Sequence, residues 1–557
     1  MTSATSAVVT HPALSCSFKG LEKSFFETGG ATVWQFRGIE YGTIPARFQQ
    51  AILNEKFPPS FNGTFYRPKC PQLVTETRLE GMLIGVPPKH VPENAPDIFD
   101  EFHCLNLNIT TPPGAREGQD YPVMVYIHGG GGFSGSNSDW WCDPSGIVSK
   151  SITMEKPVVV VTINYRLSVL GNLASQELRD AHGDRDGGNY AFHDMHLALE
   201  WVHKHIGPFG GSCSDITTYG ESFGSLGVET LLHSELTPRF SKAILQSEVL
   251  GAPLLTNPET IAAKSATYDK MKTYLGVTTV QELQTVDWQD LLKAYMACNA
   301  RAGLPEVPMI DDIVLSANWR DNYNFARGRS GIVMIGNTLN EGSAIEAILA
   351  GAPKSESPPT TQSLITAVRA ALPDLPIGAI FSQYQIAEDT ALSIVRAQLL
   401  TMIEDIAWFI PTVELVEKLE NPHPFRKCTV YQYSFQQLSP FEGQFKGRPA
   451  HALDLAYLHG DPEIFILNGT KETNIELQSQ EFLKGQWVLF ADGEVLWDSK
   501  KIMEIGPYEL GGPVDIDTFL KEKRDSDRWN AFKPLSFANL EVLTGLLLGH
   551  LSQLNGV

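Results

Sequence analysis

Residues 215–236, with the sequence DITTYGESFGSLGVETLLHSEL, contain the change of pattern that decides the fold. The first six residues, 215–220, predict a strand, and residues 222–236 predict a helix. Between the two, Ser222 occupies the centre of a Gly-x-Ser-x-Gly pattern formed with Gly220 and Gly224. Glycine at both positions allows a turn that is too tight for larger side chains. The stretch therefore predicts a strand, a sharp turn and a helix, with the hydroxyl group of Ser222 standing clear of the strand end.

The segments around this turn repeat the alternation of strand and helix. Apolar β-branched runs predict strands that are buried on both faces, and the periodicity of Phe192–Ile206 predicts a helix. The predicted strands are Pro122–Gly130, Pro157–Arg166, 241–248, Gly331–Asn337 and Cys428–Phe435. This alternation is typical of an α/β fold with a large, mostly parallel central sheet flanked by helices. We expect one domain over residues 1–557, with mainly helical insertions at about 255–330 and 343–420 covering the C-terminal edge of the strands.

The composition is that of a globular protein with a substantial core. Hydrophobic residues make up 43% of the 557 residues and charged residues 19%, within the usual range for such proteins. The formal net charge of −21 opposes binding to a nucleic acid or to an anionic membrane surface. The longest apolar runs are too short to span a bilayer, so we expect no stable membrane insertion. Nothing in the sequence indicates an oligomeric state.

The N-terminal residues MTSATSAVVTHPALSCSFKG have neither the basic start nor the apolar core of a signal peptide. This favours a cytoplasmic protein. Three N-glycosylation sequons, at Asn62, Asn108 and Asn468, are about what chance produces and do not argue for export. The seven cysteines are an odd number, so at least one thiol lacks an intramolecular partner.

Ser222 is the candidate nucleophile, and a serine needs a base and an orienting acid to attack a carbonyl carbon. In folds with this turn the three groups follow in the order serine, acid, histidine. Glu341 follows the predicted strand Gly331–Asn337 and is the expected acid, whereas Asp311 and Asp312 precede that strand. The bland alternatives are a serine that only caps the following helix and a glutamate in a surface loop.

Four histidines lie late enough in the chain to serve as the base: His423, His451, His459 and His550. His451 lies in a loop broken by glycine and proline, beyond the predicted strand Cys428–Phe435, and such a loop can bring an imidazole back over the sheet edge. His451 is therefore the expected base, and His459 is the alternative.

An oxyanion that forms on the substrate needs preorganised hydrogen-bond donors. The segment YIHGGGGFSGS, residues 126–136, places glycines directly after a buried strand, where larger side chains would obstruct the substrate. We expect the N–H groups of Gly130, Gly131 and Phe223 to form the oxyanion hole. A merely flexible glycine loop would not explain why these residues end a hydrophobic strand.

Taken together, the motifs resemble those of the type-B carboxylesterase and lipase family, the cholinesterase-like α/β-hydrolases, with the nearest likeness to fungal carboxylesterases. The similarity runs from Phe36–Phe48 to beyond His451. The matching motifs are KCPQ at Cys70, CLNLNI at Cys104, HGGGGFSGS, TINYRLSVLGNL, WVHKHIGPFGG, GESFGS, ILQSE and GNTLNEGS.

The resemblance implies an α/β-hydrolase fold and cofactor-independent hydrolysis of small carboxylic esters through an acyl-enzyme. It places the nucleophile at Ser222, the acid at Glu341, the base at His451 and the oxyanion glycines at Gly130 and Gly131. It also implies a supporting network through Glu221 and Ser247, which are equally compatible with a structural role. A disulfide between Cys70 and Cys104 is a further implication, although a reducing cytosol opposes it.

Two residues depart from the family pattern. Gly132 stands where the family usually has an aromatic residue, and Phe223 stands where it usually has alanine. We hypothesise that the ring of Phe223 fills the space left at Gly132 and reshapes the acyl side of the pocket.

Several alternatives stay open. The segment between Cys70 and Cys104 contains no tryptophan, which argues against a choline-ester specialist, since such enzymes bind quaternary ammonium on an indole face. The sequence RLEGMLIGVPP, residues 78–88, is compatible with a lipase flap or with simple loop packing. An acyltransferase would use the same triad, and a non-catalytic binding module is the rival from another class.

Two other groups of residues in the sequence give weaker signals. His193, His196 and His203 could share a helix face, but no HExxH pattern accompanies them, so we predict no metal site. Trp140 and Trp141 follow the oxyanion segment and are compatible with either a gorge wall or core packing.

Overall fold

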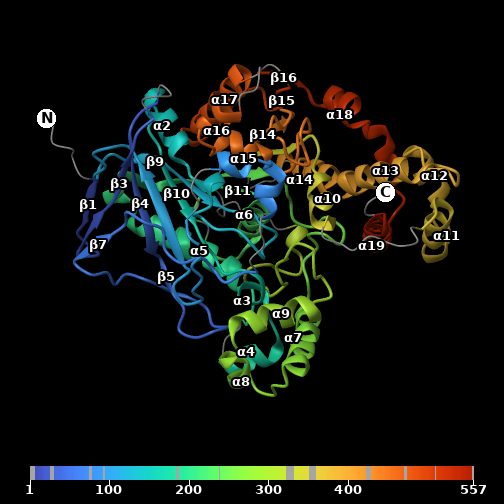
Figure 1. The fold of residues 1–557 in the computed structure, drawn as a ribbon, viewed down its shortest axis with the longest axis horizontal. Coiled ribbons are helices and arrows are strands. Elements are labelled where there is room, and N and C mark those ends of the chain that lie inside the picture. The colour runs from blue at the N-terminus through green and yellow to red at the C-terminus, as the bar shows by residue number, and fades with distance from the viewer. Residues whose placement is uncertain are drawn as a thin grey trace.

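The computed structural model describes most of the chain. The described residues are 7–25, 30–73, 78–91, 95–182, 187–237, 239–321, 331–350, 359–421, 428–468, 473–507 and 510–554. Figure 1 shows a central twisted sheet with helices packed on both faces and helical lobes beside it.

Within the described residues, eleven strands form the central sheet in the order β16-β15-β14-β13-β12-β11-β9-β10-β8-β4-β3. The strands of this sheet are β3 (Leu21–Lys23), β4 (Val33–Glu40), β8 (Asn106–Thr111), β9 (Tyr121–Ile127), β10 (Val159–Ile163), β11 (Gly211–Glu221), β12 (Lys242–Gln246), β13 (Gly331–Thr338), β14 (Cys428–Phe435), β15 (Lys501–Ile505) and β16 (Pro513–Asp515). Two small sheets lie beside it, formed by β1 (Val8–His11), β2 (Cys16–Lys19) and β7 (Ser60–Asn62), and by β5 (Gly42–Thr43) and β6 (Ile52–Leu53).

The middle of the sheet is parallel and its margins are antiparallel. Each neighbouring pair from β10 through β9, β11, β12, β13 and β14 to β15 is parallel. The pairs β10·β8, β4·β8, β3·β4 and β15·β16 are antiparallel. Because parallel strands end at the same edge, the turns after β9, β11, β12, β13 and β14 gather on one side of the sheet.

The central strands are buried on both faces, as their unbroken apolar runs predict. In β9, Val123, Val125 and Ile127 face the core that contains α5 (Tyr190–His205) and α6 (Phe223–His233). Met124 and Tyr126 face the core that contains α15 (Leu453–Leu458) and α17 (Thr473–Ala491). A third core lies apart from the sheet. It is formed mainly by α11 (Thr361–Ala371), α12 (Ile377–Gln383), α13 (Leu392–Glu404), the π-helical turn η7 (Asp405–Phe409) and α19 (Phe537–Gln553).

The helices surround the sheet and extend beyond it. The helices are α1 (Leu79–Ile84), α2 (Ser145–Thr153), α3 (Ser168–Asn172), α4 (Gln176–His182), α5 (Tyr190–His205), α6 (Phe223–His233), α7 (Ile261–Leu275), α8 (Val280–Thr285), α9 (Trp288–Cys298), α10 (Ser343–Leu349), α11 (Thr361–Ala371), α12 (Ile377–Gln383), α13 (Leu392–Glu404), the π-helical turn η7 (Asp405–Phe409), α14 (Ile410–Glu420), α15 (Leu453–Leu458), α16 (Glu463–Asn468), α17 (Thr473–Ala491), α18 (Ile516–Arg524), the 3₁₀ turn η8 (Ser526–Ala531) and α19 (Phe537–Gln553).

The two expected insertions differ from each other. The first has helices α7–α9, which form the green lobe at the bottom of Figure 1, but residues 299–318 are irregular. This stretch is bonded to other segments instead: the backbone N–H of Glu306 donates to the carbonyl of Gly131, and the guanidinium group of Arg301 donates to the carbonyls of Leu254 and Leu255. The second insertion is helical over most of its described length, from α10 to α14.

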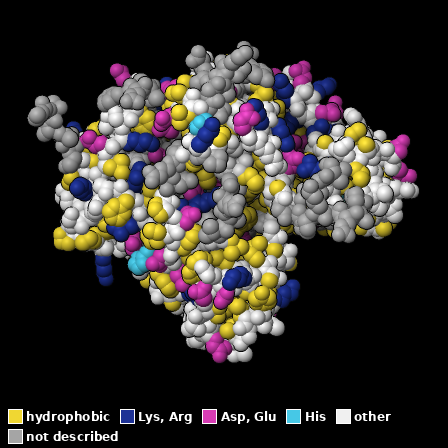
Figure 2. Space-filling model, in the orientation of Figure 1, with side chains coloured by type: hydrophobic (Ala, Val, Ile, Leu, Met, Phe, Trp, Pro, Cys, Tyr) yellow, Lys and Arg dark blue, Asp and Glu magenta, His cyan; other side chains and the backbone are white. Residues whose placement is uncertain are grey.

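The surface shows no separation of charge on the visible face. In Figure 2 basic and acidic side chains are interspersed among hydrophobic ones over most of this face. In the part of the chain that the structure describes, no helix is both long and apolar enough to cross a membrane.

Candidate active site

Ser222 lies at the sharp turn between β11 and α6, at the edge where the parallel strands end. Its backbone dihedrals are φ 55° and ψ −126°, so the residue cannot continue the helix, and α6 starts one residue later than the sequence predicts. A Cβ on Gly220 would lie 2.4 Å from the carbonyl carbon of Gly224, and one on Gly224 would lie 2.0 Å from the carbonyl oxygen of Ile127. Only glycine permits this approach, which confirms the predicted turn.

The predicted acid and base are in direct contact. Nδ1 of His451 lies 2.5 Å from Oε2 of Glu341, and the other oxygen of Glu341 accepts the N–H of Thr338 at 2.6 Å. The loops that bear the two residues are also joined, because the N–H of His451 donates to Oγ of Ser343 at 2.8 Å. Glu341 and His451 are both buried. The carboxylate can therefore hold the imidazole in one orientation and one tautomer.

The other imidazole nitrogen faces the serine turn. Nε2 of His451 lies 3.2 Å from Oε1 of Glu221, the residue directly before Ser222. No hydrogen bond joins Ser222 and His451 among the described contacts, and catalytic contacts of this kind are often loose in a free enzyme. The fold thus brings the three predicted residues to one place, while their roles stay a prediction.

His459, the alternative base, is held by its neighbours. Its Nδ1 contacts the carbonyl of Trp141 at 2.8 Å and must donate there, and its Nε2 contacts the hydroxyl of Tyr219 at 3.0 Å. Burial lowers the pKa of His459 to about 4. With both nitrogens engaged in the core, His459 is not placed to take a proton from Ser222. His423 lies outside the described residues.

Asp311 and His550, which the sequence makes a less suitable acid and base, are each held in another part of the protein. One carboxylate oxygen of Asp311 accepts the N–H groups of Ile313, Val314 and Leu315. His550 is buried in the C-terminal helix α19.

The predicted oxyanion residues form a turn with an unusual backbone. Gly130, Gly131 and Gly132 all have positive φ, at 96°, 63° and 76°. Their carbonyl groups are bonded within the protein: that of Gly130 to the N–H groups of Phe133 and Ser134, that of Gly131 to Glu306, and that of Gly132 to Ser168. No acceptor within the described residues takes the N–H groups of Gly130, Gly131 and Phe223. The three predicted donors are therefore free for a substrate oxygen.

The hypothesis about Gly132 and Phe223 agrees with the packing. A Cβ on Gly132 would lie 2.7 Å from Cε2 and 2.8 Å from Cζ of the Phe223 ring. The ring is 1% exposed and stacks on Tyr165, with a centroid distance of 5.9 Å. Phe223 thus occupies the space beside Gly132, and its effect on the acyl pocket stays a prediction.

Buried carboxyl groups surround His451 in greater number than the sequence indicates. Burial raises the pKa of Glu221 well above its ordinary value, and the charges of Asp454 and Glu80 add to the effect. Burial also raises the pKa of Asp454 to about 6, although Nε2 of Gln246 donates to its carboxylate at 2.9 Å. Glu80 lies on α1, inside the segment for which the sequence suggested a flap. A Cβ on Gly129 would meet the carboxylates of both Glu221 and Glu80, at 2.7 and 3.1 Å.

Sequence reasoning missed Trp408 as well. Nε1 of Trp408 donates to the carbonyl of Ser247 at 2.7 Å, and the ring meets His451 edge-on with a centroid distance of 6.1 Å. Trp408 lies in η7, and π-helical turns are frequent at functional sites. Its apolar surroundings in the sequence resemble ordinary core, so no local signal identifies it. Oγ of Ser247 makes no hydrogen bond with any described residue.

The structure also describes the surroundings of the cysteines, tryptophans and histidines that the sequence analysis names. Cys70 and Cys104 are buried side by side as free thiols, and contact with Cys70 raises the pKa of Cys104 well above its ordinary value. Trp140 and Trp141 belong to the buried core, which is the packing alternative. His196 and His203 contact the carbonyls of Thr237 and Cys213. Over the described ranges, no group of three or more His, Cys, Asp or Glu side chains is arranged to hold a metal ion.

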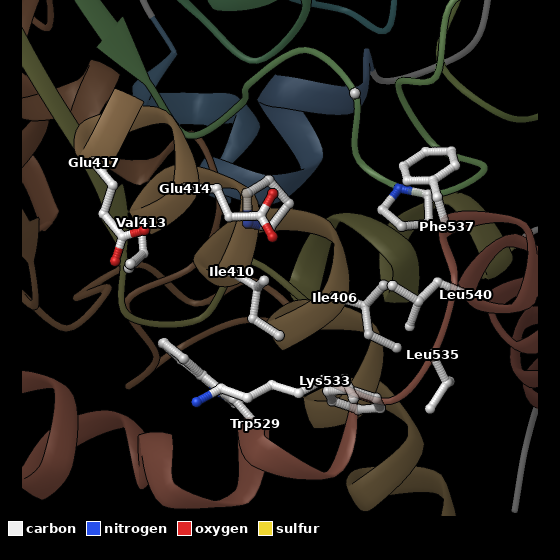
Figure 3. Close-up of a pocket in the computed structure, with 14 residues that line it drawn as sticks. Ile406, Ile410, Val413, Glu414, Glu417, Trp529, Lys533, Leu535, Phe537 and Leu540 are labelled. Atoms are coloured by element: carbon white, nitrogen blue, oxygen red, sulfur yellow. The ribbon is translucent and has the colours of Figure 1, made fainter. Parts of the chain in front are cut away.

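A cavity of about 420 Å³ is lined mainly by residues of η7 and α14 and by residues between 529 and 540. Figure 3 shows Ile406 and Ile410 at its centre, with Glu414 and Glu417 toward one end and Trp529 and Lys533 opposite them.

The chain is similar to known proteins in sequence and in fold. A model of the carboxylesterase family matches residues 7–525. Lipase 1 of Yarrowia lipolytica is 32% identical over 343 residues, which cover 60% of this chain and 62% of the lipase, so the chain spans less than two thirds of that relative. Carboxylesterase 1E of Mus musculus is 27% identical over 520 residues, covering 88% of this chain and 87% of that protein.

The fold has a solved counterpart. A structure of a PNB esterase superposes with a TM-score of 0.69 over 94% of this chain and 99% of that chain, at 23% sequence identity. At this identity the likeness establishes the fold, and together with the parallel sheet it confirms the predicted α/β-hydrolase architecture.

Proposed function

The chain belongs to the carboxylesterase family, and on this premise we propose that it is a cofactor-independent serine hydrolase of small carboxylic esters. The observation that carries the proposal is the position of His451. Its Nδ1 lies 2.5 Å from Glu341, and its Nε2 faces the turn that bears Ser222. This is the order of contacts by which a carboxylate orients a base toward a nucleophile.

In the proposed reaction, Oγ of Ser222 attacks the ester carbonyl carbon while Nε2 of His451 takes the hydroxyl proton. The tetrahedral oxyanion accepts hydrogen bonds from the N–H groups of Gly130, Gly131 and Phe223. The alcohol then leaves with the proton from His451, and an acyl-enzyme stays on Ser222. Water then attacks the acyl carbon while it gives a proton to Nε2 of His451, and His451 passes that proton to Oγ of Ser222 as the acid leaves, which restores the enzyme.

The carboxylates around the imidazole support the charge that this mechanism requires. Glu341 contacts Nδ1 directly, and it stabilises the imidazolium that forms when His451 holds the proton. Glu221 lies 3.2 Å from Nε2 and, when ionised, acts in the same direction. Burial raises the pKa of Glu221 well above that of an ordinary glutamate, so Glu221 loses this charge at a higher pH than an exposed glutamate would.

The substrate class within the esters is the finer part of the proposal. We favour a carboxylesterase that acts on soluble esters, because Leu83 and Ile84 of α1 are buried in the described structure and do not present an apolar face to an interface. Lipase activity is the second candidate, since the relatives include proteins named as lipases. An acyltransferase would require that an alcohol or amine replace water at the second step.

A fluorophosphonate probe with mass spectrometry tests the proposal. We expect covalent labelling of Ser222 in the wild-type protein, no labelling in Ser222→Ala, and hydrolysis of p-nitrophenyl butyrate by the wild type only. A folded wild-type protein that is neither labelled nor active would identify a binding module instead. Rates on tributyrin below and above its solubility limit separate the esterase from a lipase, whose rate rises when the interface forms.

A further inference from the structure

Glu404 is a buried carboxyl group that the proposed mechanism does not use. It is the last residue of α13 and is 6% exposed. Its Oε1 accepts the N–H of Gly342 at 2.8 Å and the side-chain amide of Asn340 at 3.2 Å. Gly342 and Asn340 are the two neighbours of Glu341 in the chain. One carboxylate thus holds the backbone on one side of the acid and a side chain on the other.

The same loop is held from a second direction by the C-terminal part of the chain. Nη2 of Arg524, the last residue of α18, donates to the carbonyl of Thr338 at 3.1 Å. Its Nη1 lies 3.8 Å from Oε2 of Glu404, and its guanidinium group stacks 3.2 Å from the centre of the Phe409 ring. Arg524 is 4% exposed. The pair Glu404–Arg524 therefore grips the loop Thr338–Gly342 at its start and its end.

This grip sets the position of the acid. The N–H of Thr338 donates to Oε1 of Glu341, and Oε2 of Glu341 contacts Nδ1 of His451. A shift of the loop by a fraction of an ångström would lengthen that short contact. Residues that position a catalytic group matter because a misplacement of about 1 Å can lower a rate on the order of 100-fold.

We propose that Glu404 is a positioning residue that holds Glu341 against His451, with Arg524 as its partner. The inference rests on the proposed function, because it assumes that Glu341 orients the base. It assigns a catalytic purpose to a residue of the helical insertion that no sequence motif marks. Glu404 touches neither the substrate nor the reacting atoms, so its effect passes through the loop.

Glu404 takes up a proton within a pH range that enzyme assays cover. Burial raises the pKa of Glu404 to about 7, and the positive charge of Arg524 opposes this. The charged groups that face it are Arg524 from α18, Asp405 from η7 and Glu341 from the loop. Asp405 is itself paired with Arg528 of η8 at 2.7 Å. Proton uptake removes the negative charge from an acceptor of two hydrogen bonds and weakens both of them.

Three variants separate positioning from stability. Glu404→Gln keeps an acceptor for Gly342 without a charge, Glu404→Ala removes the acceptor, and Asp405→Asn alters the adjacent ion pair with Arg528, which does not touch the loop. We expect Glu404→Ala to lower kcat on p-nitrophenyl butyrate about 10-fold with KM unchanged. Glu404→Gln resembles the protonated carboxyl group, so its activity at pH 8 should lie between those of the wild type and Glu404→Ala. Asp405→Asn should lower Tm and leave kcat unchanged below the melting range.

The pH profile gives a readout that a merely structural role would not move. In the wild type, Glu404 becomes neutral as the pH falls through about 7, and kcat/KM declines with it. In Glu404→Gln the group cannot titrate, so the acidic limb should shift to lower pH. The pH profiles of Glu404→Gln and the wild type test the proposal even if Glu404→Ala does not fold. An acidic limb that coincides in Glu404→Gln and the wild type would overturn the proposal, as would a wild-type kcat in folded Glu404→Ala.

A spectroscopic signal distinguishes this inference from the proposed function. The short contact of His451 Nδ1 with Glu341 should give a far-downfield proton resonance in the wild type, which His451→Gln removes. We expect that resonance to be lost or shifted in Glu404→Ala and kept in Asp405→Asn. If the wild type is neither labelled at Ser222 nor active, the hydrolase proposal fails, while the resonance still tests whether Glu404 positions Glu341.

Discussion

The parallel centre of the sheet and the helical insertions contribute to the same site by different means. Ser222, Glu341 and His451 follow the ends of β11, β13 and β14, and the ladder of backbone hydrogen bonds places those ends side by side. Glu306, Glu404 and Trp408 come from the insertions and reach the site through side-chain packing and single hydrogen bonds. The positions of the three proposed catalytic residues thus depend on backbone geometry, and the positions of the groups around them depend on tertiary contacts.

This difference has a consequence for mutations. A group at a strand end is held by a network that one substitution does not displace, so removing its side chain tests its chemistry. A group from an insertion supports other residues, so removing it tests position or stability. Variants of the two kinds should therefore differ in whether kcat or Tm responds.

The largest expected effect belongs to His451, the proposed base at the sheet edge. His451→Gln should lower kcat by a factor of about 10⁴ or more, because loss of one member of a triad disables the whole. His459→Gln is the matched control, since His459 is equally buried but bonded to Trp141 and Tyr219. We expect it to lower Tm and to keep activity in steady-state assays. Equal losses of kcat in the two variants would contradict the assignment of the base.

The oxyanion turn should give the next effect. A Cβ on Gly130 would lie 2.1 Å from the carbonyl oxygen of Ser134, so Gly130→Ala displaces the N–H donor and should lower kcat about 10²- to 10³-fold. Gly114→Ala is the control, because Gly114 also has positive φ, at 78°, but meets nothing within 4 Å. Steady-state measurements of kcat should separate Gly130→Ala from Gly114→Ala. A comparable loss of kcat in both variants would mean that backbone strain alone is responsible.

The buried acid Asp454 should make stability depend on pH. Burial raises its folded pKa from 3.8 to about 6, so the folded protein binds this proton more tightly than the unfolded chain does. The contribution of the group to stability is complete below pH 3.8 and is lost as the pH rises through about 6.

In Asp454→Asn the side chain cannot ionise, so the loss of unfolding free energy between pH 4 and 8 should shrink by about 3 kcal/mol. Denaturant titrations at several pH values measure it. Asp492→Asn, in an exposed ion pair with Lys156, should leave the pH dependence almost unchanged. A wild-type slope in Asp454→Asn would show that the proton uptake belongs to another group.

The smallest expected effect concerns the contact between Gly132 and Phe223, the two residues that depart from the family pattern. Gly132→Ala should destabilise the protein because its Cβ meets the Phe223 ring. Phe223→Ala removes the ring, so the double variant should be more stable than the sum of the singles by about 1–2 kcal/mol. Positive φ at residue 132 and the Cβ of Glu306 limit the rescue. For the control pair Gly114→Ala and Phe223→Ala, the changes in unfolding free energy should simply add. If those of Gly132→Ala and Phe223→Ala also add, the two residues do not share one space.

Most of the sheet and the strand-end residues could be predicted from the sequence. The strands at 122–130, 157–166, 331–337 and 428–435 all correspond to strands of the structure within a few residues. Periodicity and β-branched runs are local signals, and a parallel sheet then places their ends at one edge. Glycines at 130, 131, 220 and 224 were informative because each occupies a position where a Cβ would clash.

The residues that surround the site could not be predicted in this way. Glu80, Glu404 and Trp408 lie 371, 47 and 43 positions from His451 in the chain, and nothing near them in the sequence differs from an ordinary helix. Their importance arises from burial beside the imidazole and its supporting loop, which is a property of the packed structure. The irregular stretch 299–318 likewise depends on distant partners such as the carbonyl of Gly131.

The sequence by itself determined the class of fold, the order of the strand-end residues and the glycine turn that offers free N–H groups. It could do so because backbone conformation is governed by local sterics and by the alternation of apolar residues. Only the tertiary structure placed His451 against Glu341, enclosed His459 between Trp141 and Tyr219, and brought Glu404 to the loop Thr338–Gly342. Those outcomes depend on which polar groups meet inside a low-dielectric core, and that is settled by contacts between segments far apart in the chain.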